Sequence, residues 1–198
     1  MKQWQMGALM ALTLLAGCAG IARQQTQFYL LEPLAEPAPV AKIERDAWLG
    51  LGPVTLARYL DRPQMVTRIG PGRLHLAELH QWAGPLQENI AQVLRDNLTR
   101  LLGSERLVSL PARGLPPLGW QLEVEILRLD AGPGPEARLE ARWSLLDGDS
   151  QRVLQIERSR LTQPLSAGLE DPAGLSRAYS ELLAALSAEM AAALVTGG

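Results

Sequence analysis

Cys18 is the only cysteine of this 198-residue chain, and its neighbours give it a specific chemistry. It closes the tetrapeptide Leu15-Ala16-Gly17-Cys18, an aliphatic residue and two small residues before a cysteine, which is typical of a bacterial lipobox. In such a motif the thiol accepts a diacylglycerol, and cleavage between Gly17 and Cys18 then frees an amino group for an N-acyl chain. The sequence therefore predicts that Cys18 becomes a lipidated N-terminus.

The residues before Cys18 have the composition of a secretory signal. Lys2 supplies a positive start, and residues 6–15 form an apolar run that is shorter than the about 20 residues of a membrane-spanning helix. We therefore expect a signal peptide at 1–17, a lipidated tether at 18–26 and a single domain at 27–198. The alternatives are an ordinary secretory signal or an uncleaved membrane anchor.

The residue after the cysteine and the overall charge bear on location and partners. Ala19 follows Cys18, where an Asp would commonly retain a lipoprotein in the inner membrane, so the periplasmic face of the outer membrane is expected. The formal net charge of −2 gives no basic face for nucleic acid. We therefore expect attachment to a membrane through lipid and no nucleic-acid partner.

Residues that could carry catalysis or bind a metal do not occur in a recognisable pattern. The chain has no phosphate-binding Walker A loop and no G-x-S-x-G nucleophile motif, and its single thiol is assigned to lipid. The two histidines, His75 and His80, are five apart, whereas helical zinc ligands are four apart. We therefore expect no catalytic residue, no metal and no cofactor other than the acyl chains on Cys18, and an enzyme is the alternative.

The first half of the domain is expected to contain short strands and one amphipathic helix. Strands are indicated at 28–31 and 48–54, and two more at 65–69 and 73–76 around a Gly-Pro-Gly turn. A helix over 86–102 follows from its apolar spacing. Its end signals are Gly84 as a cap, Pro85 in the first turn and Gly103 after the last turn.

The second half is expected to contain an antiparallel meander and a second helix. Apolar and charged residues alternate over 121–126 and again over 136–145, and a third strand is indicated near 153–161. Asp171 as a cap and Pro172 in the first turn begin a helix whose apolar stripe indicates core packing. The fold class is therefore α/β with α+β character, one domain with a mixed, mostly antiparallel sheet and two main helices.

Two further stretches carry a resemblance to a known family. The runs Tyr-Leu-Asp-Arg-Pro-Gln at 59–64 and Trp-Ala-Gly-Pro-Leu at 82–86, with the lipobox and the 28–31 strand, are similar to the ABC-type transport auxiliary lipoprotein family, of which PqiC-like proteins are a branch. The resemblance covers nearly the whole mature chain. It implies a mixed sheet with packed helices, like that of anticodon-binding domains.

The resemblance also implies a role. It points to a non-enzymatic subunit of a lipid-transport system, which docks a periplasmic MCE-domain protein at the outer membrane and assembles as a ring-like homo-oligomer. A periplasmic lipid-binding carrier and a structural lipoprotein of another envelope complex are the alternatives, and a carrier would need an apolar cavity.

The motif residues are expected to divide into a structural group, of which Trp82 and Leu86 hold the turn from inside, and an exposed group. Charged and amide side chains are poor core residues, whereas a Trp at a helix start is typically a packing anchor. The exposed group, a candidate interface, is Asp61, Arg62 and Gln64. The structural group is Tyr59, Pro63, Trp82, Pro85 and Leu86.

Overall fold

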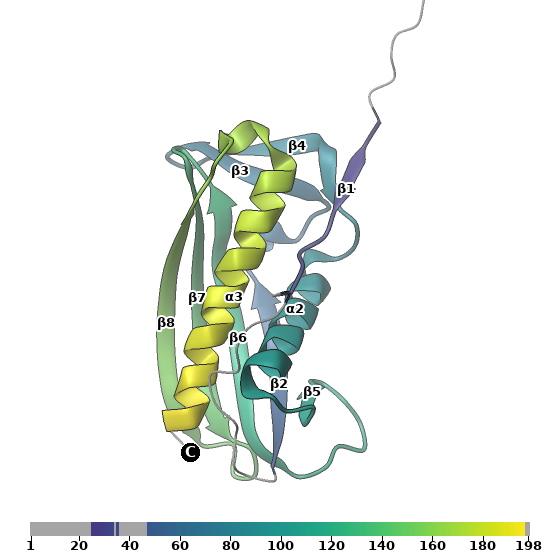
Figure 1. The fold of residues 1–198 in the computed structure, drawn as a ribbon, viewed down its shortest axis with the longest axis vertical. Coiled ribbons are helices and arrows are strands. Elements are labelled where there is room, and N and C mark those ends of the chain that lie inside the picture. Colours follow the sequence, from purple (N-terminus) through teal and green to yellow (C-terminus); the bar gives the residue numbers. More distant parts are fainter. Residues whose placement is uncertain (1–24, 34, 36–46, 197–198) are drawn as a thin grey trace, which may run out of the picture.

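The protein is described here by a computed structural model that covers residues 25–33, 35 and 47–196. In this part of the chain eight strands and two α-helices surround one core (Figure 1). In chain order the elements are β1 (Gln27–Tyr29), β2 (Trp48–Leu56), η2 (Arg58–Leu60), β3 (Gln64–Gly70), β4 (Arg73–Trp82), α2 (Leu86–Leu102), β5 (Leu107–Ser109), β6 (Leu118–Ala131), β7 (Glu136–Asp147), β8 (Val153–Pro164), η3 (Gly168–Glu170) and α3 (Pro172–Thr196).

All eight strands form one open sheet, with β1 and β5 at the ends of the main strand order and β8 at the opposite margin. The order is β1-β4-β3-β6-β2-β5, and β7 and β8 extend the sheet from the other side of β6. The long ladders β6–β7 and β7–β8 are antiparallel, and so is β3–β4. Parallel pairs join β1 to β4 and β2 to β5 and β6. Both helices cover the same face of the sheet (Figure 1), which confirms a single α+β domain with a mixed sheet.

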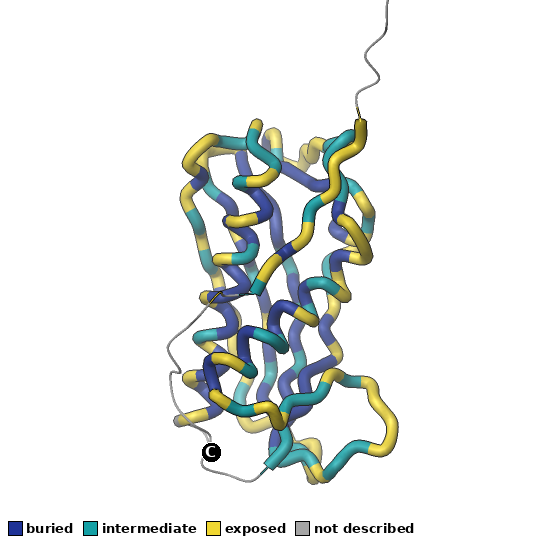
Figure 2. Tube along the Cα trace, turned by 45° about the vertical axis from the view of Figure 1, so that its right-hand side comes forward, coloured by how far each residue is buried: buried dark blue, intermediate teal, exposed yellow. Residues whose placement is uncertain are grey.

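The alternating sequence of β7 explains why one face of the sheet is buried. Residues 137, 139, 141, 143 and 145 of this strand are buried against the helices, and the charged residues between them are directed to the opposite face. Buried positions alternate in the same way over residues 122–126 of the neighbouring strand β6, and Figure 2 shows the buried positions gathered between the layers. The predicted antiparallel meander is therefore confirmed.

The two helices differ in how they begin and in how they end. Helix α2 starts at Leu86 with Pro85 as its cap, so the expected cap at Gly84 is wrong by one residue, and Pro85 precedes the first turn. Pro85 has no backbone N–H that would need a partner at the helix start, and its φ of −58° is close to the value of a helical residue. Gly103 ends the helix in the left-handed conformation, at φ 57° and ψ 33°, as expected.

Helix α3 begins at Pro172, immediately after Asp171, as the sequence indicated. By length and apolar composition alone, residues Pro172–Val195 could cross a membrane, and this is the only such helix in the described part of the chain. However, 61% of its apolar stretch is buried in the domain, and Tyr179, Leu186 and Met190 are each at most 1% exposed. The apolar stripe of α3 is therefore a core element, as predicted.

Candidate interaction surface

The first described residues form an edge segment, residues 27–33, which runs from β1 into the space between α2 and α3. The side-chain amide of Asn89 on α2 binds both backbone groups of Leu31, accepting from N–H at 2.8 Å and donating to C=O at 3.1 Å. On α3, Ser176 donates to the carbonyl of Leu30 at 2.7 Å, and Ser180 accepts from the N–H of Glu32 at 3.0 Å. The edge segment is thus fixed to both helices.

The same segment is joined to the two motif runs recognised in the sequence, at 59–64 and 82–86. β1 pairs with the end of β4, where the N–H of Ala83 donates to the carbonyl of Tyr29 at 2.9 Å. The Tyr29 hydroxyl lies 2.9 Å from Nδ1 of His80. The preceding amide, that of Trp82, donates to the carbonyl of Pro63 at 2.7 Å. The edge segment, the start of α2 and residues 59–64, which we call the motif turn, are therefore contiguous.

The motif turn is fastened to the sheet by a buried carboxylate on β6. Tyr59 donates its hydroxyl to Oδ2 of Asp130 at 2.9 Å and accepts from the N–H of Leu129 at 3.3 Å. The Asp130 side chain is 0% exposed, and it also forms ion pairs with Arg68 at 2.8 Å and Arg128 at 2.7 Å. A buried carboxylate is stable only when its oxygens are paired in this way.

The four side chains of this Asp130 cluster set each other's ionisation. Burial alone would raise the pKa of Asp130, but hydrogen bonds from Arg68, Arg128 and Tyr59 outweigh it and hold that pKa below its usual range. Burial, followed by the negative charge of Asp130, raises the pKa of Tyr59 to about 12. Asp130 is therefore charged and Tyr59 is a neutral hydrogen-bond donor at physiological pH.

The residues expected to be structural differ in how far they are buried. Trp82 is 6% exposed and packs against Tyr179, with ring centroids 6.2 Å apart at 44°. Leu86 is 4% exposed and belongs to the core, whereas Pro63 and Pro85 are exposed. Tyr59 is half-buried, and its hydroxyl lies in the Asp130 cluster.

The residues expected to form an interface lie on the outside of the motif turn to different degrees. Asp61 is exposed, and Arg62 and Gln64 are half-buried. Arg62 Nε donates to the carbonyl of Tyr59 at 2.8 Å, so this side chain also closes the turn. Their role as an interface remains a prediction, and Gly17 and Cys18 lie outside the described residues.

Sequence reasoning missed two features of this surface, the Asp130 cluster and the Asn89 clamp. Asp130 ends a run of alternating strand residues, where a carboxylate reads as solvated surface. The available signal was indirect: Tyr59 in the motif run and Arg68 shortly after it would each need a partner if buried. Asn89 lies on the half-exposed side of a helix and gives no sequence signal at all.

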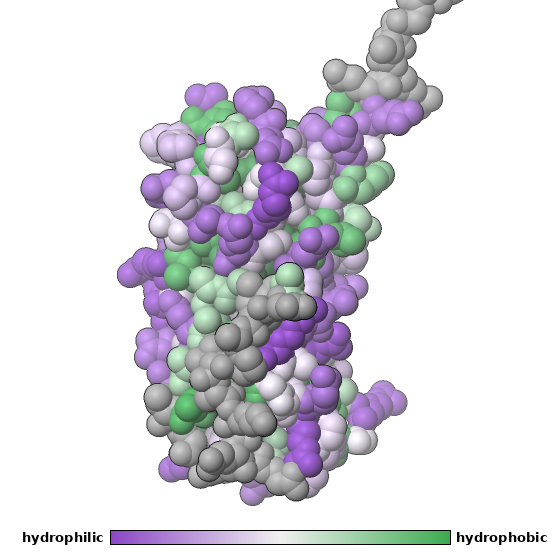
Figure 3. Space-filling view, in the orientation of Figure 1, coloured by the Kyte–Doolittle hydropathy of each residue, from purple (hydrophilic) through white to green (hydrophobic). Residues whose placement is uncertain are grey.

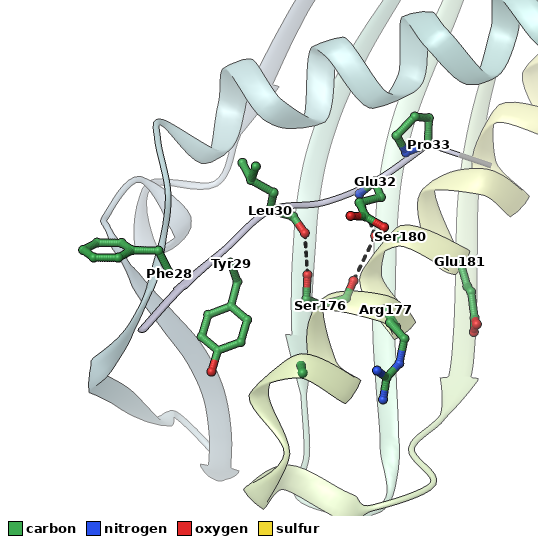
Figure 4. A pocket seen from close by; sticks show the side chains of 10 residues that line it. Phe28, Tyr29, Leu30, Glu32, Pro33, Ser176, Arg177, Ser180 and Glu181 are labelled. Atoms are coloured by element: carbon green, nitrogen blue, oxygen red, sulfur yellow. Dashed lines mark hydrogen bonds between the residues drawn. The ribbon is translucent and has the colours of Figure 1, made fainter. Parts of the chain in front are cut away.

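A groove of about 490 Å³ opens between the edge segment and α3 (Figure 4). The groove is lined by Tyr29 and Pro33 of the edge segment and by Ser176, Arg177 and Glu181 of α3. The hydroxyls of Ser176 and Ser180 are already hydrogen-bonded to the edge segment. Among the described residues no group of three or more His, Cys, Asp or Glu side chains could hold a metal ion.

The sheet face opposite the helices carries ion pairs between neighbouring strands. Arg142 of β7 pairs with Glu125 of β6, and Arg158 of β8 pairs with Glu140 of β7 at 2.9 Å. Exposed pairs of this kind each contribute about 0–1 kcal/mol, so they keep the face soluble more than they stabilise the sheet.

Solved structures define the class to which this architecture belongs. A crystal structure of a Xanthomonas campestris protein assigned to the family DUF330 is 20% identical, with a TM-score of 0.64 over 87% of this chain and 95% of that chain. A crystal structure of an uncharacterized protein is 16% identical, with a TM-score of 0.67 over 85% of this chain and 97% of that chain. The class is a single-domain α+β protein with an open sheet, and at these identities the likeness concerns the fold alone.

The sequence places the chain within that class. It matches the ABC-type transport auxiliary lipoprotein component family over residues 29–191, from the edge segment through most of α3. The chain belongs to this family, which confirms the resemblance carried by the motif runs. It is therefore a transport-auxiliary lipoprotein of the cell envelope, anchored to a membrane. No curated protein sequence matches it.

Proposed function

We propose that this protein is a non-enzymatic subunit of a lipid-transport system, which docks an MCE-domain protein at the periplasmic face of the outer membrane. Its family supports the transport role, and the lipobox at Cys18 with Ala19 after it supports the location. We further propose that it assembles as a ring-like homo-oligomer, needs no cofactor beyond the acyl chains on Cys18, and does not bind nucleic acid.

One observation carries the docking proposal. The motif turn presents Asp61, Arg62 and Gln64 at the surface while Tyr59 ties the turn to the 0% exposed carboxylate of Asp130. Holding an exposed charged turn rigid lowers the entropy lost on binding, which is useful for a contact surface. By contrast, the groove beside the edge segment is open and carries charged residues, so it does not favour the alternative of a lipid carrier.

Cys18→Ser should give unprocessed or soluble protein that carries no lipid, while the domain still folds. The substitution removes the thiol that accepts diacylglycerol, and position 18 precedes the first core residue, Leu31, by thirteen positions. Intact-mass analysis of wild-type protein extracted from membranes should show a triacylated chain starting at Cys18. A mature chain that starts elsewhere and carries no lipid would contradict the anchor.

Arg62→Glu should weaken self-assembly or binding to the MCE-domain protein, because charge reversal at a packed contact is strongly unfavourable and arginine is enriched at interface hot spots. The side chain donates one hydrogen bond to Tyr59, whose loss costs about 1 kcal/mol, so the melting temperature should fall only slightly. Size-exclusion chromatography and pull-down with the MCE-domain protein measure the two contacts.

Two variants serve as controls for this test. Arg62→Ala loses the same hydrogen bond without reversing the charge, and Arg113→Glu reverses a charge on an exposed loop away from the motif turn. Arg62→Ala should bind more tightly than Arg62→Glu, and Arg113→Glu should behave as wild type. If Arg62→Glu assembles and binds as well as wild type, the motif turn is structural and not an interface.

A further inference from the structure

The edge segment exposes two large apolar side chains on one side. Phe28 is 64% exposed and Leu30 is 55% exposed, whereas Leu31 is buried at 3%. Alternate residues of an extended chain project to the same side, and Figure 4 shows Phe28 and Leu30 projecting away from Tyr29. Burying a side chain of this size is worth about 1.5–3 kcal/mol. Two such neighbours on a rigid edge indicate that something apolar covers them.

The position of these side chains along the chain identifies what can cover them. Residues 18–26 separate the lipobox cysteine from β1, and nine residues span at most about 30 Å. Phe28 and Leu30 are the first large apolar side chains of the described domain, in β1 and directly after it. Figure 3 shows hydrophobic surface, in green, at the upper right of the molecule, the side on which β1 lies in Figure 1. A bilayer that holds the acyl chains of Cys18 is therefore always within reach of this side of the molecule.

We propose that Phe28 and Leu30 insert into the interfacial region of the phospholipid bilayer that carries the protein's own lipid anchor. This inference rests on the lipidation of Cys18 in the proposed function. Apolar burial should dominate the contact, because the groove that Phe28 and Leu30 help to line holds the cation Arg177 together with the acidic Glu32 and Glu181. The contact should therefore persist at high salt, unlike binding to anionic lipid through basic residues.

Such a contact would orient the domain rather than merely retain it. Three acyl chains already suffice for attachment, but they attach a single residue, Cys18, and do not by themselves set the direction of the domain. The edge segment is joined through Ala83 and Trp82 to Pro63 of the motif turn, so fixing Phe28 against the bilayer also fixes the height and direction of that turn. The membrane would thereby present the motif turn to a periplasmic partner in one orientation.

The test uses the lipidated full-length chain in phosphatidylethanolamine–phosphatidylglycerol vesicles. Because Cys18 is the only native cysteine and is consumed by lipid, Phe28→Cys and Leu30→Cys each offer one thiol for an environment-sensitive fluorophore. Ile156→Cys is the matched control, since Ile156 is similarly exposed at 61% but lies on β8 at the opposite margin of the sheet. Intact mass and vesicle flotation of each sample establish that the anchor is present.

The fluorescence emission of labels at positions 28 and 30 should shift to shorter wavelength and be quenched by spin-labelled lipid. The emission of the label at position 156 should show neither effect. Adding Phe28→Asp should reduce quenching at 30, because a buried carboxylate opposes insertion, although the tether is unchanged. Equal spectra at 28 and 156 in anchored protein would overturn the inference and leave the proposed function intact. So would protection at 28 that appears only with a second copy or the MCE-domain protein, and loss of the anchor itself would overturn both.

Discussion

Asp130→Ala should lower the free energy of unfolding by about 3 kcal/mol, the low end of the range for breaking a buried ion pair. The carboxylate is 0% exposed and accepts from Arg68, Arg128 and Tyr59, so its removal leaves three donors without their acceptor. The two arginine side chains keep 25% and 20% of their exposure, and water can reach them in part, which is why the loss should not be larger.

Urea unfolding followed by tryptophan fluorescence measures this loss, and two variants bracket it. Asp130→Asn keeps the shape and one acceptor oxygen, so it should lose less stability than Asp130→Ala. Asp149→Ala removes an exposed aspartate from the β7–β8 turn and should stay close to wild type. Equal stability of Asp130→Ala and Asp149→Ala would show that the cluster does not hold the motif turn.

The same cluster predicts a pH dependence with a definite sign. Folding lowers the pKa of Asp130, so at acidic pH this carboxyl group binds fewer protons in the native state than in the unfolded state. Its contribution to stability is therefore complete above the unfolded value of about 3.9 and is lost as the pH falls through the folded pKa. Wild type should lose stability over this acidic range more steeply than Asp130→Asn, as measured by urea midpoints at each pH.

Local patterns in the sequence were sufficient to predict most of the elements, because they depend on neighbours in the chain. The alternation over 136–145 identified β7 and its buried face, and the spacing over 86–102 identified α2 with Gly103 at its end. The strands β4 and β6 extend beyond their predicted ends, and β5 was missed. Those residues are strands because neighbouring strands pair with them, which no local pattern records.

The candidate site depends on contacts between residues far apart in the chain, so only its parts could be predicted. The burial of Trp82 and the exposure of Asp61 follow from residue type. The partnership of Tyr59 with Asp130 spans 71 positions, and that of Leu31 with Asn89 spans 58. The first depends on the position of η2 against β6 and the second on the place of the edge segment beside β4 and α2, and neither can be recognised from residue spacing.

Trp82→Ala should lower the free energy of unfolding by about 3–5 kcal/mol, as expected for removing a buried aromatic ring from a core. The ring is 6% exposed and packs against Tyr179 of α3, so the cavity would open between β4 and the helix layer. In a domain of this size the melting temperature should fall by roughly 6–20 °C. Trp82→Phe keeps an aromatic ring against Tyr179 and should fall by much less.

The consequence of Trp82→Ala should also be local, because residue 82 joins two parts of the candidate surface. Its amide donates to Pro63 of the motif turn, and the next amide donates to Tyr29 of the edge segment. A cavity under this junction should loosen both bonds, so the amides of residues 82 and 83 should exchange hydrogen faster than those of β7, even where the protein is fully folded.

Arg62→Glu leaves the ring in place and should not accelerate this exchange. If both variants weaken partner binding but only Trp82→Ala accelerates exchange, Trp82 acts by holding the surface in shape and Arg62 by touching the partner. Faster exchange in Arg62→Glu would instead mean that its hydrogen bond to Tyr59 is what the motif turn requires.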